Sequence, residues 1–437
     1  MRYLILLSSI VLGFQAASAD SEFVGMFMQG KRIGYMRTTI THEPAGTRTI
    51  SASHINATIL GSAMQLDMTA DSLSKGGLLT KQVIVIESGG RSQRITATYG
   101  KKAIDIVRVA DGATDKKSVP IPEGALIMDD PTFGIVGKGM PKAGTKLTFY
   151  SLDPMLLVLV KNEALFKGPA SITVDNKQVD AFLVEVSEPR STTSLYLDVK
   201  GEFVYAKGLL GITMKPITRE EALGNADYAP EIDIADASRV VPDKPIENHT
   251  NVTGLTLQLK GGELKRLKSD YYQTVTRVSP EVLTLKVHPV VHDAAAPKKA
   301  MEEFRGPGLD VPSDEPEFKD LAKKVFGSEK DQYKAALAVS KYVNSVMRPK
   351  TNVGMVRDAR EIWKTKEGVC RDYATLACTI LRAGDVPCKV VSGSVYSAGA
   401  FYYHAWIEAW DGSAWIAFDP TLGGGLADAT HLKFAEG

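Results

Sequence analysis

The first half of the chain is built of short segments in which apolar and polar side chains alternate. A period of two is typical of strands that bury one face. Met64, Leu66 and Met68, for example, alternate with Gln65 and Asp67. Glycine-containing turns separate these segments, which favours an antiparallel meander or sandwich. The segments that we expect to be strands are 23–28, 33–40, 49–60, 64–73, 82–87, 92–99, 171–174, 179–186, 194–197 and 203–205.

A helical patch, a second β segment and a linker are expected between residues 154 and 308. The apolar patch at 154–163 favours a helix between the two groups of strands. Residues 250–290 return to alternation and predict a further short β segment. The alanine, proline and glycine residues at 294–299 and 306–308 are typical of a linker.

Beyond residue 310 the apolar period changes to three and four residues, which indicates helices. Phe318, Leu321 and Ala322 give one apolar face to a helix that begins near 314–317 and ends at Gly327. A second helix is expected at about 328–347. The segments 388–395 and 402–410 then predict two strands of a terminal antiparallel sheet.

A third helix is expected directly after Cys370. Gly368 breaks the chain before this helix, Gly384 is expected to form a left-handed cap after it, and Pro387 prevents its continuation. Cys370 would therefore occupy the first helical turn. There the unpaired N–H groups and the positive end of the helix dipole favour the thiolate, whose pKa is about 8.5 in free cysteine. The same N–H groups could hold an oxyanion.

The strand at 402–410 carries a histidine that a thiol could use as a base. Its even positions, His404 among them, share one face of the strand. The dipeptide Asp411-Gly412 predicts a two-residue hairpin turn after it. In that register Asp419 lies directly opposite His404, with Cβ atoms about 4.5–5.5 Å apart. A bulged or longer turn would change the register.

Four stretches of this region, taken together, resemble the motifs of the transglutaminase-like superfamily. The resemblance covers roughly residues 310–437, and the motifs occur in the family's order. The stretches are Trp363-Lys364-Thr365-Lys366-Glu367-Gly368-Val369-Cys370-Arg371-Asp372-Tyr373-Ala374, His404-Ala405-Trp406-Ile407-Glu408, Asp419-Pro420-Thr421 and Asp428-Ala429-Thr430-His431.

The resemblance implies a papain-like site in which Cys370 is the nucleophile, His404 the base and Asp419 the orienting acid. Members of the superfamily include protein cross-linkers, peptidases, amidases and proteins that have lost activity. Membership therefore indicates a class of chemistry and leaves the substrate open.

Each of these residues also has a structural interpretation. A buried helical cysteine is more often a small hydrophobe than a nucleophile. The joint pattern of Cys370, His404 and Asp419 favours catalysis over that reading. Outside the triad, we interpret His431 as a structural residue near the last strand. Arg371 and Asp372 are expected on the surface, in the first turn of the helix. The tryptophans of this region are expected to form a core face or the wall of a cleft.

The start of the chain predicts export. A basic start at Met1-Arg2 precedes an apolar core at 3–14 and a small-residue cleavage site at Ala17-Ser18-Ala19. This pattern is typical of a secretory signal peptide, and its apolar run is too short for a membrane span. We therefore expect cleavage near Ala19, a periplasmic or extracellular location, and no transmembrane segment.

The charge balance and the motifs of the sequence indicate which kinds of partner and cofactor to expect. The 52 basic and 51 acidic residues leave a net charge of +1, which does not favour nucleic acid as a partner. His288 and His292 are not spaced as a helical ligand pair, and no calcium-loop motif occurs. We expect no cofactor and no metal. The expected partner is a protein or peptide substrate, and the oligomeric state is left open.

Two cysteines remain besides Cys370. Cys378 lies late on the predicted helix and Cys388 begins the strand that returns after Pro387, so the two thiols could approach each other. A disulfide between them requires close Cα atoms with suitable directions. Two separate buried thiols are the alternative, and the sequence does not decide between the two.

The predicted fold class is α+β, with a C-terminal transglutaminase-like (papain-like) domain preceded by a mostly antiparallel β region. The boundaries that we expect are 1–19 for the signal peptide, 20–250 for the β-rich region, 251–309 for a short β segment with a linker, and 310–437 for the catalytic domain.

Three functions are compatible with this organisation. The favoured one is an exported thiol acyl-transfer enzyme that acts on protein or peptide amides and is hydrolytic rather than cross-linking, since water is the default acceptor unless a site excludes it. The alternatives are a protein-glutamine transglutaminase and a non-catalytic envelope protein, with a binding or a structural role, that retains the fold.

Overall fold

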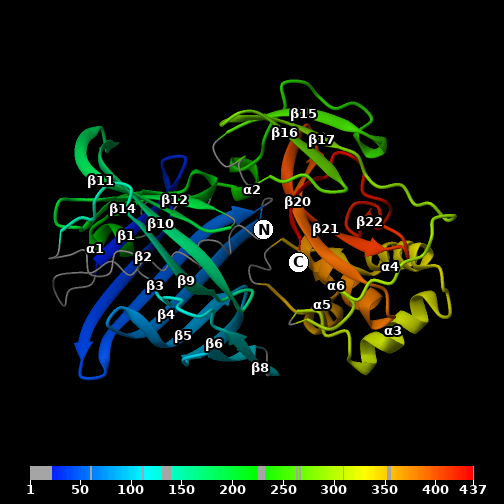
Figure 1. Ribbon diagram of the computed structural model, residues 1–437, viewed down its shortest axis with the longest axis horizontal. Helices are drawn as coiled ribbons and strands as arrows, with labels where there is room; N and C mark the ends of the chain where they lie inside the picture. Colours follow the sequence, from blue (N-terminus) through cyan, green and yellow to red (C-terminus); the bar gives the residue numbers. More distant parts are fainter. Residues whose placement is uncertain are drawn as a thin grey trace. The chain divides into compact units, whose positions relative to one another are not determined.

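A computed structural model gives the structure of the chain. It describes residues 22–436 except for 60–61, 111–112, 130–138, 190, 225–231, 262–263, 265–266, 309 and 352–355. The signal peptide expected at 1–19 lies outside the described residues. The described chain forms two compact units that divide between Ala237 and Ser238. They are coloured blue to green and green to red in Figure 1.

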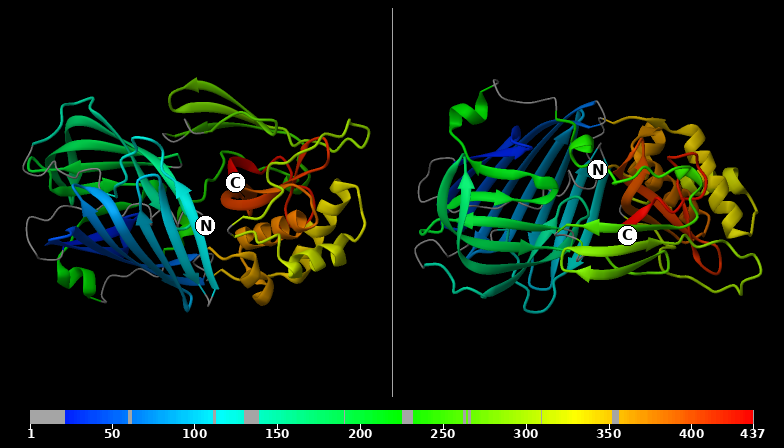
Figure 2. Two further views of the ribbon diagram at one scale, coloured as in Figure 1. Left: turned by 60° about the horizontal axis from the view of Figure 1, so that its bottom comes forward. Right: turned by 90° about the horizontal axis from the view of Figure 1, so that it is seen from above.

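The N-terminal unit is a single antiparallel sheet of fourteen described strands, which Figure 2 shows to be strongly curved. Strands β1 to β8 and β9 to β14 each follow one another along the sheet, and the two runs meet where β1 pairs with β14. The strands are β1 (Glu22–Met28), β2 (Lys31–Glu43), β3 (Gly46–Ile59), β4 (Ser62–Lys75), β5 (Leu78–Ser88), β6 (Arg91–Tyr99), β7 (Ala103–Ala110), β8 (Ala113–Pro120), β9 (Lys146–Asp153), β10 (Val158–Val174), β11 (Lys177–Ser187), β12 (Thr192–Leu197), β13 (Phe203–Lys207) and β14 (Thr213–Pro216).

Alternation predicted strands at β1 to β6 and β10 to β13 and missed β7, β8, β9 and β14. Where it predicted a strand, the alternation is also visible in the burial of the side chains. In β4, Met64, Met68 and Ala70 are buried while Gln65 is exposed. One face of the sheet therefore carries the core, and the expected antiparallel arrangement is confirmed. Short helices accompany the sheet: η2 (Leu209–Gly211), α1 (Arg219–Leu223) and α2 (Ile234–Ala237).

The helix expected at 154–163 is wrong, because this segment is a tight turn followed by the start of β10. Asp153 Oδ1 accepts hydrogen bonds from the N–H groups of Met155 and Leu156 at 2.8 and 3.0 Å. Leu157 then takes a positive φ of 48°, which reverses the chain. A continuous apolar run does not by itself distinguish a helix from a buried strand.

The C-terminal unit has α+β architecture. A four-stranded antiparallel sheet has the order β22-β21-β20-β23. Its strands are β20 (Cys388–Ser397), β21 (Ala400–Trp410), β22 (Trp415–Phe418) and β23 (Leu432–Glu436). Its helices are η4 (His249–Asn251), α3 (Pro316–Phe326), α4 (Gln332–Val346), α5 (Ala359–Thr365) and α6 (Cys370–Ala383). A second sheet contains β15 (Leu255–Lys260), β16 (Gln273–Ser279) and β17 (Val282–Val287), and β18 (Arg348–Pro349) pairs with β19 (Glu367–Gly368).

Strand β21 is covered on both faces. Ala405 and Ile407 pack into the core that α6 shares with α3, α4 and α5. Trp406, on the opposite face, belongs to the same buried cluster as Leu283 and Leu285 of β17. The β segment expected at 250–290 is therefore confirmed, and it covers the sheet on the side away from α6 (Figure 1).

Gly384 ends α6 for a reason other than the one expected. Its φ is −96°, so the predicted left-handed cap is wrong. A Cβ at this position would collide with the ring of Phe326 at the end of α3. The glycine thus permits close packing between the two helices. The neighbouring Asp385 takes the left-handed conformation instead, with φ of 67°.

A cluster of charged side chains is buried on the Trp406 face of the sheet. Glu408 of β21 lies 3.3 Å from Lys389 Nζ and 3.0 Å from Lys433 Nζ. Both lysines also contact the half-exposed Glu436, at 2.7 and 2.6 Å. The Lys389 ammonium lies over the ring of Trp415, 4.6 Å from its centroid. Because Glu408 is fully buried, it carries the main charge compensation for the two ammonium groups.

We predict that Glu408→Gln lowers the free energy of unfolding by about 3 kcal/mol, since it leaves two buried ammonium groups without their internal carboxylate. Glu436→Gln is the matched control, because Glu436 contacts the same lysines and is partly exposed. It should cost less than about 1 kcal/mol. Urea denaturation of both variants measures the difference, and equal losses would contradict the assignment.

Candidate active site

Cys370 is the first residue of α6. The β18–β19 pair leads the chain into the helix, and Val369 stands at the N-cap. The thiol is partly buried, whereas every side chain from Arg371 to Leu381 is buried. The expected first-turn position is confirmed. The cysteine therefore lies where unpaired helical N–H groups and the helix dipole favour negative charge.

Asp372 holds the start of this helix in place. Its Oδ2 accepts hydrogen bonds from the Val369 N–H at 2.9 Å and from Arg357 Nη2 at 2.8 Å. Arg371 contacts its other oxygen at 3.3 Å. The interpretation of Arg371 and Asp372 as surface residues is wrong, since both are buried. Valine has no side-chain acceptor, so the acid at the third helical position supplies the cap. A Cβ on Gly368 would collide with Arg357 and Asp372.

His404 lies on β21 beyond the last residue that pairs with β22. The hairpin joining these strands pairs Trp410 with Trp415, so its loop has four residues and not the predicted two. Asp411 Oδ1 closes this loop by accepting from the Ser413 and Ala414 N–H groups at 2.7 and 2.8 Å. The ladder ends at Phe418, so the edge of β21 at residues 402–406 has no partner from β22.

Asp419 therefore does not stand opposite His404 in the ladder, as the two-residue turn predicted. The chain turns away after Phe418, and the Thr421 and Leu422 N–H groups donate to Asp419 Oδ1 at 2.7 and 3.1 Å. This turn aims the second carboxylate oxygen at the histidine. Asp419 Oδ2 lies 2.8 Å from His404 Nε2, so the expected contact forms by a different route.

The thiol and the imidazole also meet. His404 and the Ala405 backbone N–H are the groups that stabilise the Cys370 thiolate and lower the pKa of the thiol. Because His404 Nε2 is bonded to Asp419, Nδ1 is the nitrogen left for the thiol. The unpaired edge of β21 explains the Ala405 contact, since this N–H has no strand partner. His404 thus stands between Asp419, to which it is hydrogen-bonded, and the Cys370 thiol, whose pKa it lowers.

The contacts shift the three pKa values in the directions that thiol chemistry needs. Burial disfavours the Cys370 thiolate, but the bond to His404 and its charge bring the pKa of the thiol below the ordinary value. Burial likewise opposes protonation of His404, yet Asp419 and Cys370 raise the pKa of the imidazole to about 10. The charged imidazoles hold the pKa of Asp419 well below its usual range, against the effect of burial.

His431 joins this group, although the sequence placed it apart from the site. Its Nε2 lies 3.1 Å from Asp419 Oδ2, the same oxygen that binds His404. Its ring is buried, with its centroid 5.7 Å from that of His404 and 5.2 Å from that of Trp406. The spacing Asp428-Ala429-Thr430-His431 was the available signal, but the fold of residues 419–431 was needed to show where the ring points.

The donor atoms of His404, Asp419 and His431 lie within 4.8 Å of one another, as the ligands of a metal ion would. Here both Nε2 atoms are engaged with one carboxylate oxygen, at 2.8 and 3.1 Å. His404 must also keep Nδ1 toward the thiol. We therefore assign these atoms to a hydrogen-bonded chain.

The remaining cysteines are free thiols. Cys378 and Cys388 are both buried, and Cys378 Sγ donates to the Cys388 carbonyl at 3.2 Å. The two side chains approach each other as expected, and of the two alternatives the structure shows the separate thiols. Neither lies at the start of a helix or beside a histidine base.

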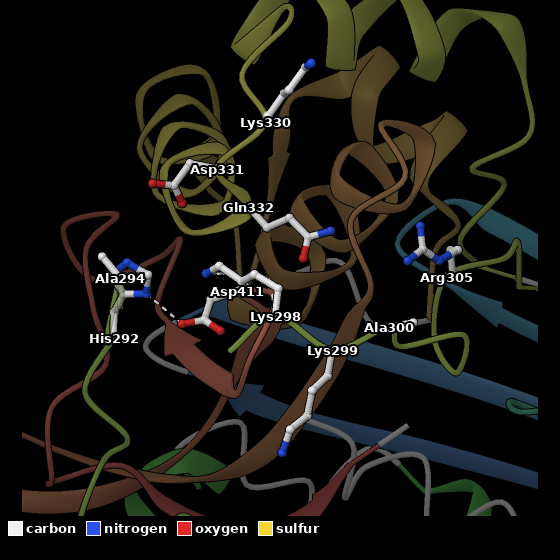
Figure 3. A pocket seen from close by; sticks show the side chains of 11 residues that line it. His292, Ala294, Lys298, Lys299, Ala300, Arg305, Lys330, Asp331, Gln332 and Asp411 are labelled. Carbon is white, nitrogen blue, oxygen red and sulfur yellow. Dashed lines mark hydrogen bonds and ion pairs between the residues drawn. The ribbon is translucent and has the colours of Figure 1, made fainter. Parts of the chain in front are cut away.

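A pocket of about 580 Å³ lies at the other end of α6 and β21, around the loop that follows Trp410. Figure 3 shows His292 pointing to Asp411, with Nδ1 and Oδ2 2.6 Å apart. The His292 ring stacks on Tyr333 at 4.1 Å. None of the triad residues lines this pocket. The residues that line it are His292, Ala294, Lys298, Lys299, Ala300, Arg305, Lys330, Asp331, Gln332, Asp411 and Gly412.

Several solved structures align with parts of the chain. A putative cysteine protease from Cytophaga hutchinsonii is 19% identical with a TM-score of 0.30, over 43% of this chain and 78% of that one. A β-barrel-like protein of a domain of unknown function from Brucella abortus is 10% identical with a TM-score of 0.33, over 46% and 96%. A putative protease from Parabacteroides distasonis is 8% identical with a TM-score of 0.20, over 75% and 63%.

A search of curated protein sequences finds no significant relative. Among the helices of the described residues, none has the length and apolar character that a membrane span requires. A comparison with protein-family models identifies part of the chain. The model for the transglutaminase-like superfamily matches residues 319–420. That range begins in α3, includes α6 and ends directly after Asp419. Residues 319–420, which contain Cys370, His404 and Asp419, are a transglutaminase-like superfamily domain.

Proposed function

We propose that the protein is an exported thiol acyl-transfer enzyme that hydrolyses amide bonds of proteins or peptides. The observation that carries this proposal is the position of the His404 imidazole, which is hydrogen-bonded to Asp419 through Nε2 and interacts with the Cys370 thiol. The superfamily match supports a thiol enzyme in broad terms. The reaction subtype and the roles of the three residues are our inference from their geometry.

The first half of the reaction would form a thioester. The Cys370 thiolate attacks the amide carbonyl carbon, and the negative charge moves to the carbonyl oxygen. The N–H groups in the first turn of α6 are the candidate donors for that oxygen. As the C–N bond breaks, the His404 imidazolium gives its proton to the departing nitrogen, and the product amine leaves.

The second half of the reaction would release the acyl group. His404, now neutral, takes a proton from a water molecule, whose oxygen attacks the thioester carbonyl. The C–S bond breaks, the carboxylic acid leaves, and the proton returns the Cys370–His404 pair to its starting state. A primary amine in place of water would give a new amide instead, which is the reaction of a cross-linking enzyme. We favour water, because it is the default acceptor unless a site excludes it.

We predict that Cys370→Ala abolishes turnover and leaves the fold intact. The thiol lies in the first turn of α6 at the margin of the core, and alanine removes only its sulfur atom, so the circular dichroism spectrum should change little. Cys378→Ala is the matched control, because it removes a buried thiol of the same helix that has no histidine partner and should retain turnover. Full residual activity of purified Cys370→Ala would overturn the assignment.

We predict that the pH dependence of Cys370 alkylation shows whether the Cys370 thiol and the His404 imidazole titrate as a coupled pair. The thiolate should form above the lowered Cys370 pKa and stay paired with the imidazolium up to the His404 pKa of about 10, so iodoacetamide should react rapidly well below pH 8.5. Asp419→Asn removes the charge that raises the His404 pKa, and the alkylation midpoint should move upward toward about 8.5. His404→Ala should move it at least as far. Identical midpoints near 8.5 in all three proteins would show that no pair exists.

We predict that Asp419→Asn lowers kcat by up to about 10⁴-fold, the loss seen for the same change in a serine-protease triad. The amide keeps the shape of the side chain, but its NH₂ group can face His404 and select the wrong tautomer. His404→Ala should cost more, because it removes the base and raises the thiol pKa together. Steady-state kinetics of both variants measure this order, and an unchanged kcat in Asp419→Asn would contradict the orienting role.

The reaction products show whether the acyl acceptor is water or an amine. The mature protein is incubated with an unstructured protein substrate, with and without a primary amine such as putrescine. Hydrolysis of backbone amides predicts fragments with new amino termini. Transamidation predicts ammonia release, amine incorporation and cross-linked ladders, and that outcome would overturn the hydrolytic assignment.

N-terminal sequencing of the exported protein tests the proposed export, since the mature protein should begin after Ala19.

A further inference from the structure

His431 has an oxygen acceptor beside each of its ring nitrogens. Nε2 lies 3.1 Å from Asp419 Oδ2. Nδ1 lies 3.2 Å from the Asp428 carbonyl oxygen and 3.4 Å from Asp428 Oδ1. An acceptor pairs only with a donor, so both nitrogens must carry hydrogen for both contacts to be hydrogen bonds. A neutral imidazole has one N–H, and only the imidazolium has two. The contacts therefore favour the charged ring.

The residues around His431 keep it in this orientation. Asp428 Oδ1 accepts from the Thr430 N–H at 2.7 Å and from the Thr430 hydroxyl at 2.5 Å. The Tyr272 hydroxyl donates to the Asp428 carbonyl at 3.2 Å. Trp406 meets the ring of His431 edge to face, with an interplanar angle of 78°. The ring has little freedom to turn away from either carboxylate.

The charged groups that face His431 are Asp419, Asp428 and His404. Burial opposes its charge, but the bonds to the two carboxylates raise the pKa of His431 above its ordinary value, while His404 acts in the opposite direction. Asp428 responds in the matching sense, since the contact with His431 lowers the pKa of its carboxyl against the effect of burial. The two acids thus outweigh the one neighbouring imidazole.

We infer that His431 is a positively charged positioning residue, which together with Asp428 extends the triad to the chain Asp428–His431–Asp419–His404–Cys370. It holds Asp419 Oδ2 at the position where His404 needs an acceptor, and its charge offsets part of the carboxylate charge. His431 touches neither the thiol nor the reacting atoms, and it acts only through Asp419.

The expected consequence concerns the proton of His404. A general acid works best when its pKa lies near the operating pH. Asp419 alone would bind the His404 proton strongly and slow its transfer to the leaving nitrogen. A positive charge on the other side of the same oxygen weakens that hold. The inference rests on the proposed function for this kinetic consequence, whereas the charge state of His431 can be measured without any turnover.

His431→Gln separates charge from hydrogen bonding. The glutamine amide can still donate to Asp419, but it carries no charge. The ring centroids of His431 and His404 are 5.7 Å apart, and removing a unit charge at that distance should raise the His404 pKa by about two units. We expect kcat to fall by about tenfold, with KM little changed, and the alkaline limb of the kcat profile to move upward. His431→Ala also removes the donor and should lower kcat further.

The direct test is ¹⁵N NMR of protein labelled at histidine, titrated from pH 5 to 11 so that the range extends beyond the wild-type His404 pKa of about 10. The His431 signals, assigned by their loss in His431→Gln, should be those of an imidazolium at pH 7, and the His404 titration should shift upward in that variant. His292→Gln is the matched control, because it breaks another histidine–aspartate contact of the same unit and should leave His404 unchanged. A neutral His431 at pH 7, or an unshifted His404, would overturn the inference.

Two further outcomes keep the inference separate from the proposed function. If the spectra are as expected but the wild-type protein neither reacts rapidly at Cys370 nor turns over, the proposed function fails while the charge on His431 stands. If a chelator such as EDTA changes the His431 and His404 signals of the wild-type protein, the three donor atoms hold a metal ion and the inference is overturned.

Discussion

The carboxylate of Asp419 is the contact on which the site depends. One oxygen receives two backbone N–H groups, which fix the carboxylate to its own loop. The other oxygen receives His404 and His431. A buried carboxylate with this many donors stays ionised, because each hydrogen bond stabilises the charged form. Its charge is what keeps the proton on His404, and that proton in turn stabilises the Cys370 thiolate.

The fold brings these residues together because strand β22 ends and helix α6 begins beside the same edge of β21. Strand β22 ends at Phe418 and leaves the edge of β21 unpaired, while α6 begins at Cys370 against that edge. The helix start is held by Asp372, whose carboxylate supplies the cap that Val369 cannot. Packing on both faces of β21 fixes the strand itself. A site built on the ends of buried elements is positioned more rigidly than one on free loops.

Patterns in the sequence predicted the features that depend only on residues near one another along the chain. Alternation located strands β1 to β6 and β10 to β13 of the N-terminal sheet, whereas β7, β8, β9 and β14 were not predicted. The glycine before Cys370 and the apolar spacing after it located the start of α6. The segment at 154–163 was predicted wrongly, because its apolar run fits a helix and a strand equally well.

The remaining features arise from contacts between distant parts of the chain. The burial of Asp372 requires Arg357, which lies on the far side of α5 in sequence. The contact between Asp419 and His404 depends on a four-residue loop and on the turn after Phe418, neither of which follows from strand periodicity. The position of His431 depends on the path from Asp419 to β23. Such contacts are set by tertiary packing and leave no period in the sequence.

The central claim is that Cys370 is a thiolate paired with His404 in a protein whose other thiols are inert. Its most direct test is the rate of iodoacetamide labelling at each cysteine of the folded wild-type protein at pH 6, measured by mass spectrometry. The structure predicts rapid labelling of Cys370 and negligible labelling of the buried Cys378 and Cys388. Equally slow labelling of all three cysteines would contradict the ion pair and, with it, the catalytic assignment.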